Sequence, residues 1–197
     1  MLRTSAAGIA GYLLGTIPSA DVAARLASGG TVNLRACGTG NPGGANALGV
    51  LGSGWGYGVM AADISKGAVA ARVGQCLGGG RGAHAAATAS VVGHCYPVWN
   101  GFRGGKGVGC SVGQCLATFP AYFPIDLAIA TATSTRRWKS RAFAATGVAS
   151  AFWVLGAFGW WRRGWPNLWG PKPSAALPIA AAASSAVIIQ RFAAAAR

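Results

Sequence analysis

The chain has 197 residues, of which 52% are hydrophobic and 10% are charged, and 17 Lys and Arg against three acids give a formal net charge of +14. Soluble domains carry about 25% charged residues, so this composition excludes an ordinary water-exposed surface and indicates a protein embedded in lipid. The positive charge would also suit nucleic-acid binding. However, the Lys and Arg residues lie between apolar blocks, with no long soluble segment to form a basic patch, and no nucleic-acid partner is predicted.

Apolar segments of about the 20 residues that a membrane crossing needs recur along the chain. In order they are Ala6 to Leu26, Trp55 to Val73, Ala83 to Phe102, Gly107 to Thr135, Ala142 to Trp161 and Ser174 to Gln190. The first carries Asp21 and Arg25, which lie four residues apart and can form an ion pair on a helix. A signal peptide is the alternative for this segment, because Arg3 precedes its short apolar run.

The segment from Gly107 to Thr135 decides the number of crossings. It is too long for one helix and contains Pro120 and Pro124, which favour a break and two short crossings. The prediction is therefore an all-α polytopic membrane protein with about seven transmembrane helices and Gly-rich cytosolic loops, forming one domain over residues 1–197.

With seven crossings, the basic residues divide unequally between the two sides. Ten fall on the side of the C-terminus: Arg25, Arg35, Arg103, Lys106, Arg136, Arg137, Lys139, Arg141, Arg191 and Arg197. Six fall on the other side: Arg3, Arg72, Arg81, Arg162, Arg163 and Lys172. The positive-inside rule then predicts the C-terminus in the cytosol and the N-terminus outside. The outer interface would hold a tryptophan cluster made of Trp160, Trp161, Trp165 and Trp169.

Two Gly-rich segments, 38–52 and 93–107, are too polar for ordinary connectors, and both fall on the predicted cytosolic side. The first matches G-x-G-x-x-G at Gly38, Gly40 and Gly43, but no apolar strand precedes it, so a dinucleotide site is not expected. The second lacks the Gly spacing and the Ser or Thr of the Walker pattern. A nucleoside-triphosphate site is therefore excluded as well.

The second Gly-rich segment favours binding of an anion. Gly104, Gly105 and Gly107 let backbone N–H groups converge, and a helix that begins after Gly107 would point its positive end at the same place. Arg103 and Lys106 add two cations. The alternative is a tight turn whose basic residues only anchor the chain at the lipid surface.

Three further titratable residues are candidates for the same site. His94, at the start of the second segment, is either a hydrogen-bonded core residue or part of the site. Asp63 and Lys66 lie three residues apart on one helix face, where they can neutralise each other in the membrane or contribute to the site. Five cysteines without a C-x-x-C pair exclude a disulfide framework and a zinc site, and no metal is predicted.

Four stretches, in this order, resemble the motifs of one family. They are Gly11 to Ala20, Gly38 to Gly52, Asp63 to Gly67 (D-x-x-K-G) and Gly93 to Gly107, which ends in G-G-K-G. Together they are similar to the bacterial acyl-phosphate:glycerol-3-phosphate acyltransferases and cover about residues 8 to 109. The resemblance implies a seven-helix membrane enzyme that transfers a fatty acyl group from acyl phosphate to position 1 of glycerol 3-phosphate. The product would be lysophosphatidic acid for phospholipid synthesis, made without coenzyme A, metal or any other cofactor.

The resemblance also implies which residues form the site. The predicted catalytic residues are Thr39, which stands where the family usually has Ser, and also His94 and Lys106. The predicted substrate-binding residues are Gly38, Gly40, Asn41, Asn46, Lys66, Arg103, Gly104, Gly105 and Gly107. The partners would be acyl phosphate, glycerol 3-phosphate and membrane lipid. The expected location is the bacterial inner membrane, with the active face in the cytosol.

The chain departs from the family pattern at three places. Gly44 and Ala45 stand where the family typically has Ala-Thr, and Gly49 stands where it has Arg. The third family motif, roughly H-x-x-N-x-x-R-L-x-x-G-x-E, has no counterpart in these 197 residues. Two alternatives therefore stand beside the enzyme. One is a catalytically degenerate relative that binds acyl phosphate or lipid, and the other is a small transporter of a phosphorylated solute.

Overall fold

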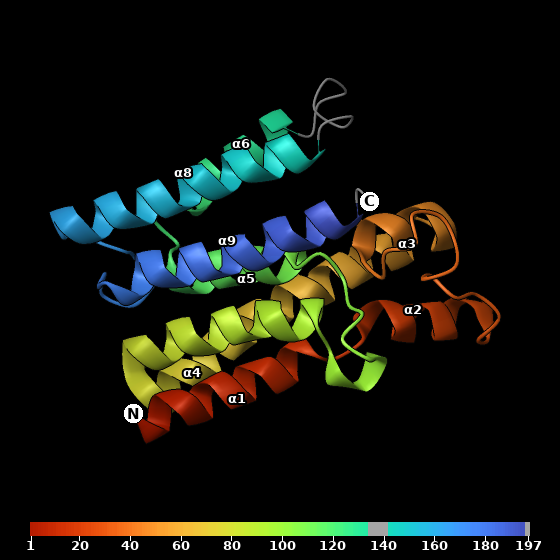
Figure 1. Ribbon diagram of the computed structural model, residues 1–197, viewed down its shortest axis with the longest axis horizontal. Coiled ribbons are helices and arrows are strands. Elements are labelled where there is room, and N and C mark those ends of the chain that lie inside the picture. The colour runs from red at the N-terminus through yellow and green to blue at the C-terminus, as the bar shows by residue number, and fades with distance from the viewer. Residues whose placement is uncertain (134–141, 196–197) are drawn as a thin grey trace.

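The computed structural model describes residues 1–133 and 142–195, whose regular structure is helical. The elements are α1 (Leu2–Gly15), α2 (Ser19–Ser28), α3 (Gly44–Leu51), α4 (Ser53–Cys95), the 3-10 turn η1 (Val98–Asn100), α5 (Val108–Thr118), α6 (Phe123–Thr133), α8 (Ala142–Arg163) and α9 (Ala176–Ala195). Figure 1 shows three layers, with α1 packed on α4, α5 and α9 in the middle, and α6 and α8 beyond them. The short helices α2 and α3 lie at one end of this bundle, which we call the site end.

The long helix α4 consists of two arms joined by a sharp bend at Gly78 and Gly79. Gly79 has φ 61° and ψ −152°, a conformation that is essentially restricted to glycine. The arms return alongside each other at close range, since a Cβ built on Gly74 would lie 2.3 Å from the carbonyl oxygen of Gly82. The two arms correspond to the predicted crossings that begin at Trp55 and Ala83.

Helix α1 packs on the second arm of α4 through glycines spaced four residues apart. A Cβ on Gly11 would lie 2.1 Å from the carbonyl oxygen of Ala86, and one on Gly15 would lie 2.1 Å from that of Ser90. Larger side chains are thus excluded from both positions. Small residues at this spacing allow the backbones of membrane helices to approach closely, and the contact anchors α1 beside the end of α4.

The predicted single crossing from Ala6 to Leu26 is wrong, because the helix breaks before Pro18. Proline has no backbone N–H and cannot continue the helix, so α1 ends at Gly15 and α2 starts at Ser19. The predicted ion pair between Asp21 and Arg25 is also wrong. Asp21 pairs instead with Arg35 of the following loop, at 2.8 Å, which ties α2 to that loop.

Two other predicted helix boundaries shift. The crossing predicted to reach Phe102 ends at Cys95, because Pro97 follows and disfavours helical geometry in the residue before it. The last crossing, predicted to end at Gln190, continues to Ala195. Arg191 and the residue after it therefore belong to the last turns of α9.

The break predicted around Pro120 and Pro124 is confirmed, because α5 ends at Thr118 and α6 begins at Phe123. Each helix has 11 residues, about 16 Å at the usual rise of 1.5 Å per residue. Between them, the fully buried Phe119 packs with residues of α8 and α9 in the largest apolar cluster of the described chain. The two short crossings are thus joined by a buried corner.

The loop between α8 and α9 caps the C-terminal end of α5. Asn167 donates to the carbonyl oxygen of Thr118 at 3.0 Å, and the indole N–H of Trp169 donates to that of Leu116 at 3.0 Å. These bonds satisfy carbonyls that the end of a helix leaves open. Of the predicted tryptophan cluster, Trp160 and Trp165 are in contact, with ring centroids 4.7 Å apart.

Seven helices follow the long axis of the bundle: α1, the two arms of α4, α5, α6, α8 and α9. The two termini lie at opposite ends of the molecule (Figure 1), as an odd number of crossings requires. By length and composition alone, Phe143–Arg163 and Ala176–Ala195 are long and apolar enough to cross a membrane. The predicted all-α, seven-helix fold is therefore confirmed.

Candidate active site

The first Gly-rich loop is shaped by one buried amide at the start of α3. Asn46 is 3% exposed. Its Oδ1 accepts a hydrogen bond from the Thr39 backbone N–H at 2.8 Å. Its Nδ2 donates to the carbonyl oxygens of Leu34 and Cys37 at 2.9 and 3.0 Å. With these bonds made, Asn46 holds the loop rather than offering its amide to a ligand. A Cβ on Gly38 (φ +61°) would lie 2.2 Å from Oδ1, so this packing requires glycine.

The second Gly-rich loop folds back onto the end of α4. The N–H groups of Gly104 and Gly105 donate to the carbonyl oxygens of Cys95 and His94, each at 3.0 Å. These two amides therefore fix the loop and are not free for an anion. Among the hydrogen bonds of residues 1–133 and 142–195, none uses the N–H of Lys106 or Gly107.

The free amides continue into the first turn of α5. Helix α5 begins at Val108 with Gly107 as its N-cap, as predicted, and the first N–H groups of a helix have no partner within it. The N–H groups of residues 106–110 thus form an uninterrupted run of donors at the positive end of a helix. The first turn of α3, which starts at Gly44, offers a second set.

Both helix starts open on one cavity of about 450 Å³, within the range of ligand sites. Its polar wall includes Thr39, His94 and Lys106, together with Asn41, Asn46, Gly107 and the start of α3. The rest of the lining is mainly apolar, with Met60 and Ile64 from the first arm of α4, Val108 and Val112 from α5 and Phe192 from α9, and it includes the carboxylate of Asp63. The site therefore pairs a cationic, donor-rich end with an apolar groove.

A buried charged cluster forms part of the cavity wall, which Asp63 and His94 line. Lys66 Nζ is 2.8 Å from Asp63 Oδ1, donates to the Ile17 carbonyl oxygen at 2.8 Å, and lies 3.5 Å from His94 Nδ1. Ser19 also donates to Asp63 Oδ1. The predicted neutralising pair is confirmed, and His94 touches it from the side of the cavity.

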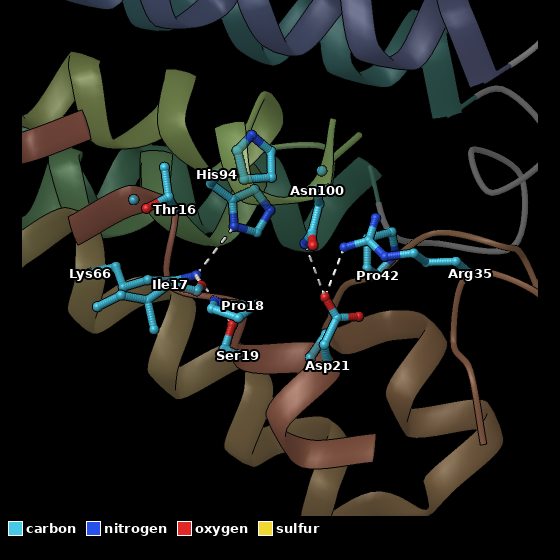
Figure 2. A pocket seen from close by; sticks show the side chains of 15 residues that line it. Thr16, Ile17, Pro18, Ser19, Asp21, Arg35, Pro42, Lys66, His94 and Asn100 are labelled. Carbon is cyan, nitrogen blue, oxygen red and sulfur yellow. Dashed lines mark hydrogen bonds and ion pairs between the residues drawn. The ribbon is translucent and has the colours of Figure 1, made fainter. Parts of the chain in front are cut away.

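A second, smaller pocket lies on the other side of His94 (Figure 2). Figure 2 shows the side chains of Lys66 and His94 meeting at one end, while Asn100 and Arg35 converge on Asp21 at the other. Arg35 also donates to the carbonyl oxygen of Arg103. This arrangement ties α2 and both Gly-rich loops together at the site end.

The structure brings most of the predicted site residues together and separates a few. Thr39, Asn41, Asn46, His94, Lys106 and Gly107 line the larger cavity, while Lys66, His94, Gly104 and Gly105 line the smaller one. Gly38, Gly40 and the exposed Arg103 side chain line neither. Arg35, Arg191 and Phe192 were not predicted as site residues, because each reaches the site from another segment of the chain.

Lys106 provides a positive charge in the cavity wall, next to the apolar Phe192. Its Nζ lies 4.5 Å from the centroid of the Phe192 ring, within the range of a cation–π contact. Burial lowers the pKa of Lys106 below its usual value, and the positive charge of Arg191 lowers it further. An anion bound beside Lys106 would offset both effects.

Comparison with known proteins decides the family. The model of the glycerol-3-phosphate acyltransferase family matches residues 5–196. The chain belongs to this family. Glycerol-3-phosphate acyltransferases of Paramagnetospirillum magneticum and Rhodopseudomonas palustris are 41% and 33% identical over 128 and 156 residues. These alignments cover 65% and 79% of this chain, and 61% and 76% of the two relatives.

Solved structures extend the similarity to the whole fold. PlsY (YgiH), an integral membrane glycerol 3-phosphate acyltransferase, matches in its glycerol 3-phosphate form with a TM-score of 0.75 at 28% identity, over 97% of this chain and 88% of PlsY. Its lysophosphatidic acid form matches with a TM-score of 0.71 at 27% identity. The family resemblance read from the four motifs is confirmed, and the chain is an integral membrane protein of the PlsY type.

Proposed function

We propose that the chain transfers a fatty acyl group from acyl phosphate to the 1-hydroxyl of glycerol 3-phosphate, giving lysophosphatidic acid for phospholipid synthesis. The cavity carries this proposal, because a phosphate suits its donor-rich end and an acyl chain suits its apolar groove. The PlsY structures contain glycerol 3-phosphate in one form and lysophosphatidic acid in the other, the acceptor and the product of this reaction.

The chemistry needs a stabilised leaving phosphate more than a strong base. The hydroxyl oxygen attacks the acyl carbonyl carbon, the bond from that carbon to the phosphate oxygen breaks, and the hydroxyl proton leaves with the departing group as hydrogen phosphate. Charge gathers on this phosphate as the bond breaks. Lys106 and the free amides of residues 106–110 are placed to stabilise that charge.

The geometry divides the predicted site residues into two roles. Thr39, Asn41, His94, Lys106 and Gly107 line the cavity, and we assign them direct contact with substrate. The remaining predicted residues support the loops or the buried cluster through their own contacts: Gly38, Gly40, Asn46, Lys66, Arg103, Gly104 and Gly105. In this assignment Lys66 neutralises Asp63 and does not bind phosphate.

An assay in reconstituted membranes tests the proposed reaction. The purified chain, in vesicles, receives acyl phosphate labelled in the acyl group, and the products are separated with and without glycerol 3-phosphate. Labelled lysophosphatidic acid that depends on the acceptor is the expected result. Tight binding of acyl phosphate without turnover would instead indicate a non-catalytic relative, and uptake of labelled solute into the vesicles would indicate a transporter.

The glycine at position 49 leads us to expect weak binding of the acceptor, glycerol 3-phosphate. It stands on an exposed face of α3 where a Cβ would meet no atom within 4 Å, so the arginine typical of the family fits there without a clash. Gly49→Arg should return one phosphate contact and lower the KM for glycerol 3-phosphate about tenfold, the effect of a charged hydrogen bond of about 1.5 kcal/mol. Gly49→Gln is the uncharged control. An ordinary low KM in the unmodified chain would contradict this prediction.

We also propose that the site end faces the cytosol of a bacterial inner membrane. The sequence count of basic residues supports this orientation, although the Arg136 to Arg141 segment that contributes most to it lies outside the described residues. Thr31→Cys at the site end and Lys172→Cys at the opposite end test it, in a chain whose Cys37 and Cys76 are replaced by alanine. In spheroplasts, a membrane-impermeant maleimide should label Lys172→Cys at once and Thr31→Cys only after lysis. The reverse pattern would invert the topology.

A further inference from the structure

The last turns of α9 contact the second Gly-rich loop at four points. Arg191 donates from Nη2 to the carbonyl oxygen of Gly104 at 2.6 Å and from Nε to that of Gly105 at 3.1 Å. Its guanidinium also lies 5.3 Å from the centroid of the Tyr96 ring. The next residue, Phe192, lies under Lys106 Nζ and lines the cavity. Two consecutive side chains thus hold the backbone and the lysine of one loop.

Because of the geometry of the peptide bond, the contacts of Arg191 also set the direction in which the neighbouring backbone N–H groups point. In a trans peptide, the C=O of one residue and the N–H of the next point in opposite directions. With the Gly104 carbonyl on Arg191, the N–H of Gly105 points away from Arg191, to the carbonyl oxygen of His94. With the Gly105 carbonyl also on Arg191, the N–H of Lys106 is turned away from α9. It is the first of the free donors described above.

The same contacts also keep the carbonyl oxygens of Gly104 and Gly105 from facing a phosphate, which they would repel. A carbonyl oxygen carries partial negative charge, and consecutive glycine peptides rotate easily enough to turn such an oxygen toward a bound anion. A guanidinium that donates to two carbonyl oxygens at once fixes both peptide planes, because its donors lie in a rigid fork. Lysine at this position would keep the charge but could not hold both planes in the same way.

We propose that Arg191 and Phe192 are positioning residues of the phosphate-binding loop, Arg191 by orienting the peptide planes of Gly104 and Gly105 and Phe192 by supporting the Lys106 ammonium. The identity of the ligand as a phosphate rests on the proposed function. The contacts that carry the inference lie between α9 and the loop, and neither residue needs to touch the reacting atoms.

Orthophosphate binding to the full-length chain in detergent tests the role without requiring turnover. We expect Arg191→Gln to raise the Kd for orthophosphate about tenfold or more, since two charged hydrogen bonds that orient the loop are lost. Arg191→Lys should give a smaller increase, and Phe192→Leu should weaken binding about threefold, the loss of one cation–π contact between half-buried side chains. Arg25→Gln, which removes one exposed positive charge from α2 at the same end, is the charge-matched control and should stay within about twofold, as expected for a distant charge in salt.

Hydrogen exchange separates positioning from a general loss of charge or of fold. The amides of Gly104 and Gly105 should exchange faster in Arg191→Gln and remain protected in Arg25→Gln. Equal Kd values and equal exchange for these two variants would overturn the inference. If Arg191→Gln fails to fold, Arg191→Lys decides, and an unchanged Kd in that variant would overturn it. Phosphate binding without acyl transfer in the unmodified chain would remove the proposed function and leave this inference intact.

Discussion

Replacing Lys106 by alanine is expected to weaken binding of acyl phosphate by about 1.5 to 3 kcal/mol, the usual scale for hydrogen bonds to charged groups. The loss of transition-state stabilisation for acyl transfer should be larger than this loss of binding free energy. Lys106 is the cation at the donor-rich end of the cavity, beside the free amides at the start of α5. Its charge should act most strongly as the phosphate leaves, because negative charge then increases. Initial rates at saturating and at low acyl phosphate, for Lys106→Ala and for Lys106→Met, separate the two effects.

The pH dependence of binding identifies the lysine more specifically than the loss of activity. Burial and the nearby Arg191 lower the pKa of Lys106, so its positive charge is lost at a lower pH than that of an exposed lysine. Affinity for acyl phosphate should therefore fall on the alkaline side, as pH rises through that lowered pKa. Lys106→Arg should keep its affinity over this range, because a guanidinium does not lose its proton there.

Lys172→Ala is the control for both measurements. Lys172 is exposed in the loop before α9, at the opposite end of the bundle from the cavity, and its removal should change neither the affinity nor its pH dependence. If Lys106→Ala binds acyl phosphate as tightly as the unmodified chain, the second Gly-rich loop is only a turn, and the phosphate is held elsewhere.

The two Gly-rich segments were enough to predict most of the polar residues that line the cavity. His94 and Lys106 were candidates from the second Gly-rich segment itself, Thr39 was implied by the family resemblance, and the helix that starts after Gly107 was expected from the glycines before it. The break at Pro120 was predicted for a similar reason, since proline limits the conformation of its own neighbourhood whatever surrounds it. Features fixed by a residue and its immediate neighbours could thus be derived from the sequence.

Features that depend on distant segments could not be derived in this way. The hydrogen bonds of Arg191 to Gly105 and Gly104 span 86 and 87 positions of the sequence, and nothing in the local pattern around Arg191 indicates these partners. The pairing of Asp21 with Arg35 instead of Arg25 depends on how the chain turns after α2. The sequence also could not show that the amides of Gly104 and Gly105 already bond to the end of α4, although a free amide and an engaged one have opposite consequences for a phosphate.

The second large effect is expected at the buried pair of Asp63 and Lys66. Their side chains are only 5% and 7% exposed, so Asp63→Asn would leave the Lys66 ammonium without a counter-charge in a medium of low dielectric constant. Removal of one partner of a buried pair costs about 3 to 5 kcal/mol. Unfolding in mixed micelles, followed by circular dichroism during titration with denaturing detergent, should show a loss of that size.

A matched pair elsewhere in the chain separates burial from charge. Asp21 and Arg35 are also 2.8 Å apart, but their side chains are 33% and 28% exposed. Water screens such a pair, and Asp21→Asn should cost about 0 to 1 kcal/mol. If the two single variants lose equal stability, burial is not the reason for the effect at Asp63.

The double variant Asp63→Asn with Lys66→Met tests whether the unpaired buried charge causes the loss of stability. Because both charges are then gone, the penalty for a buried unpaired ammonium disappears, and the chain should recover most of the stability that Asp63→Asn alone loses. The hydrogen bonds from Lys66 Nζ to the Ile17 carbonyl oxygen and to Ser19 Oγ are lost with the ammonium, whereas the new amide oxygen at position 63 can still accept from Ser19. Recovery should therefore be incomplete by about 1 kcal/mol for each lost bond. No recovery at all would mean that the cluster stabilises the break between α1 and α2 through those hydrogen bonds, and not through neutralisation of charge.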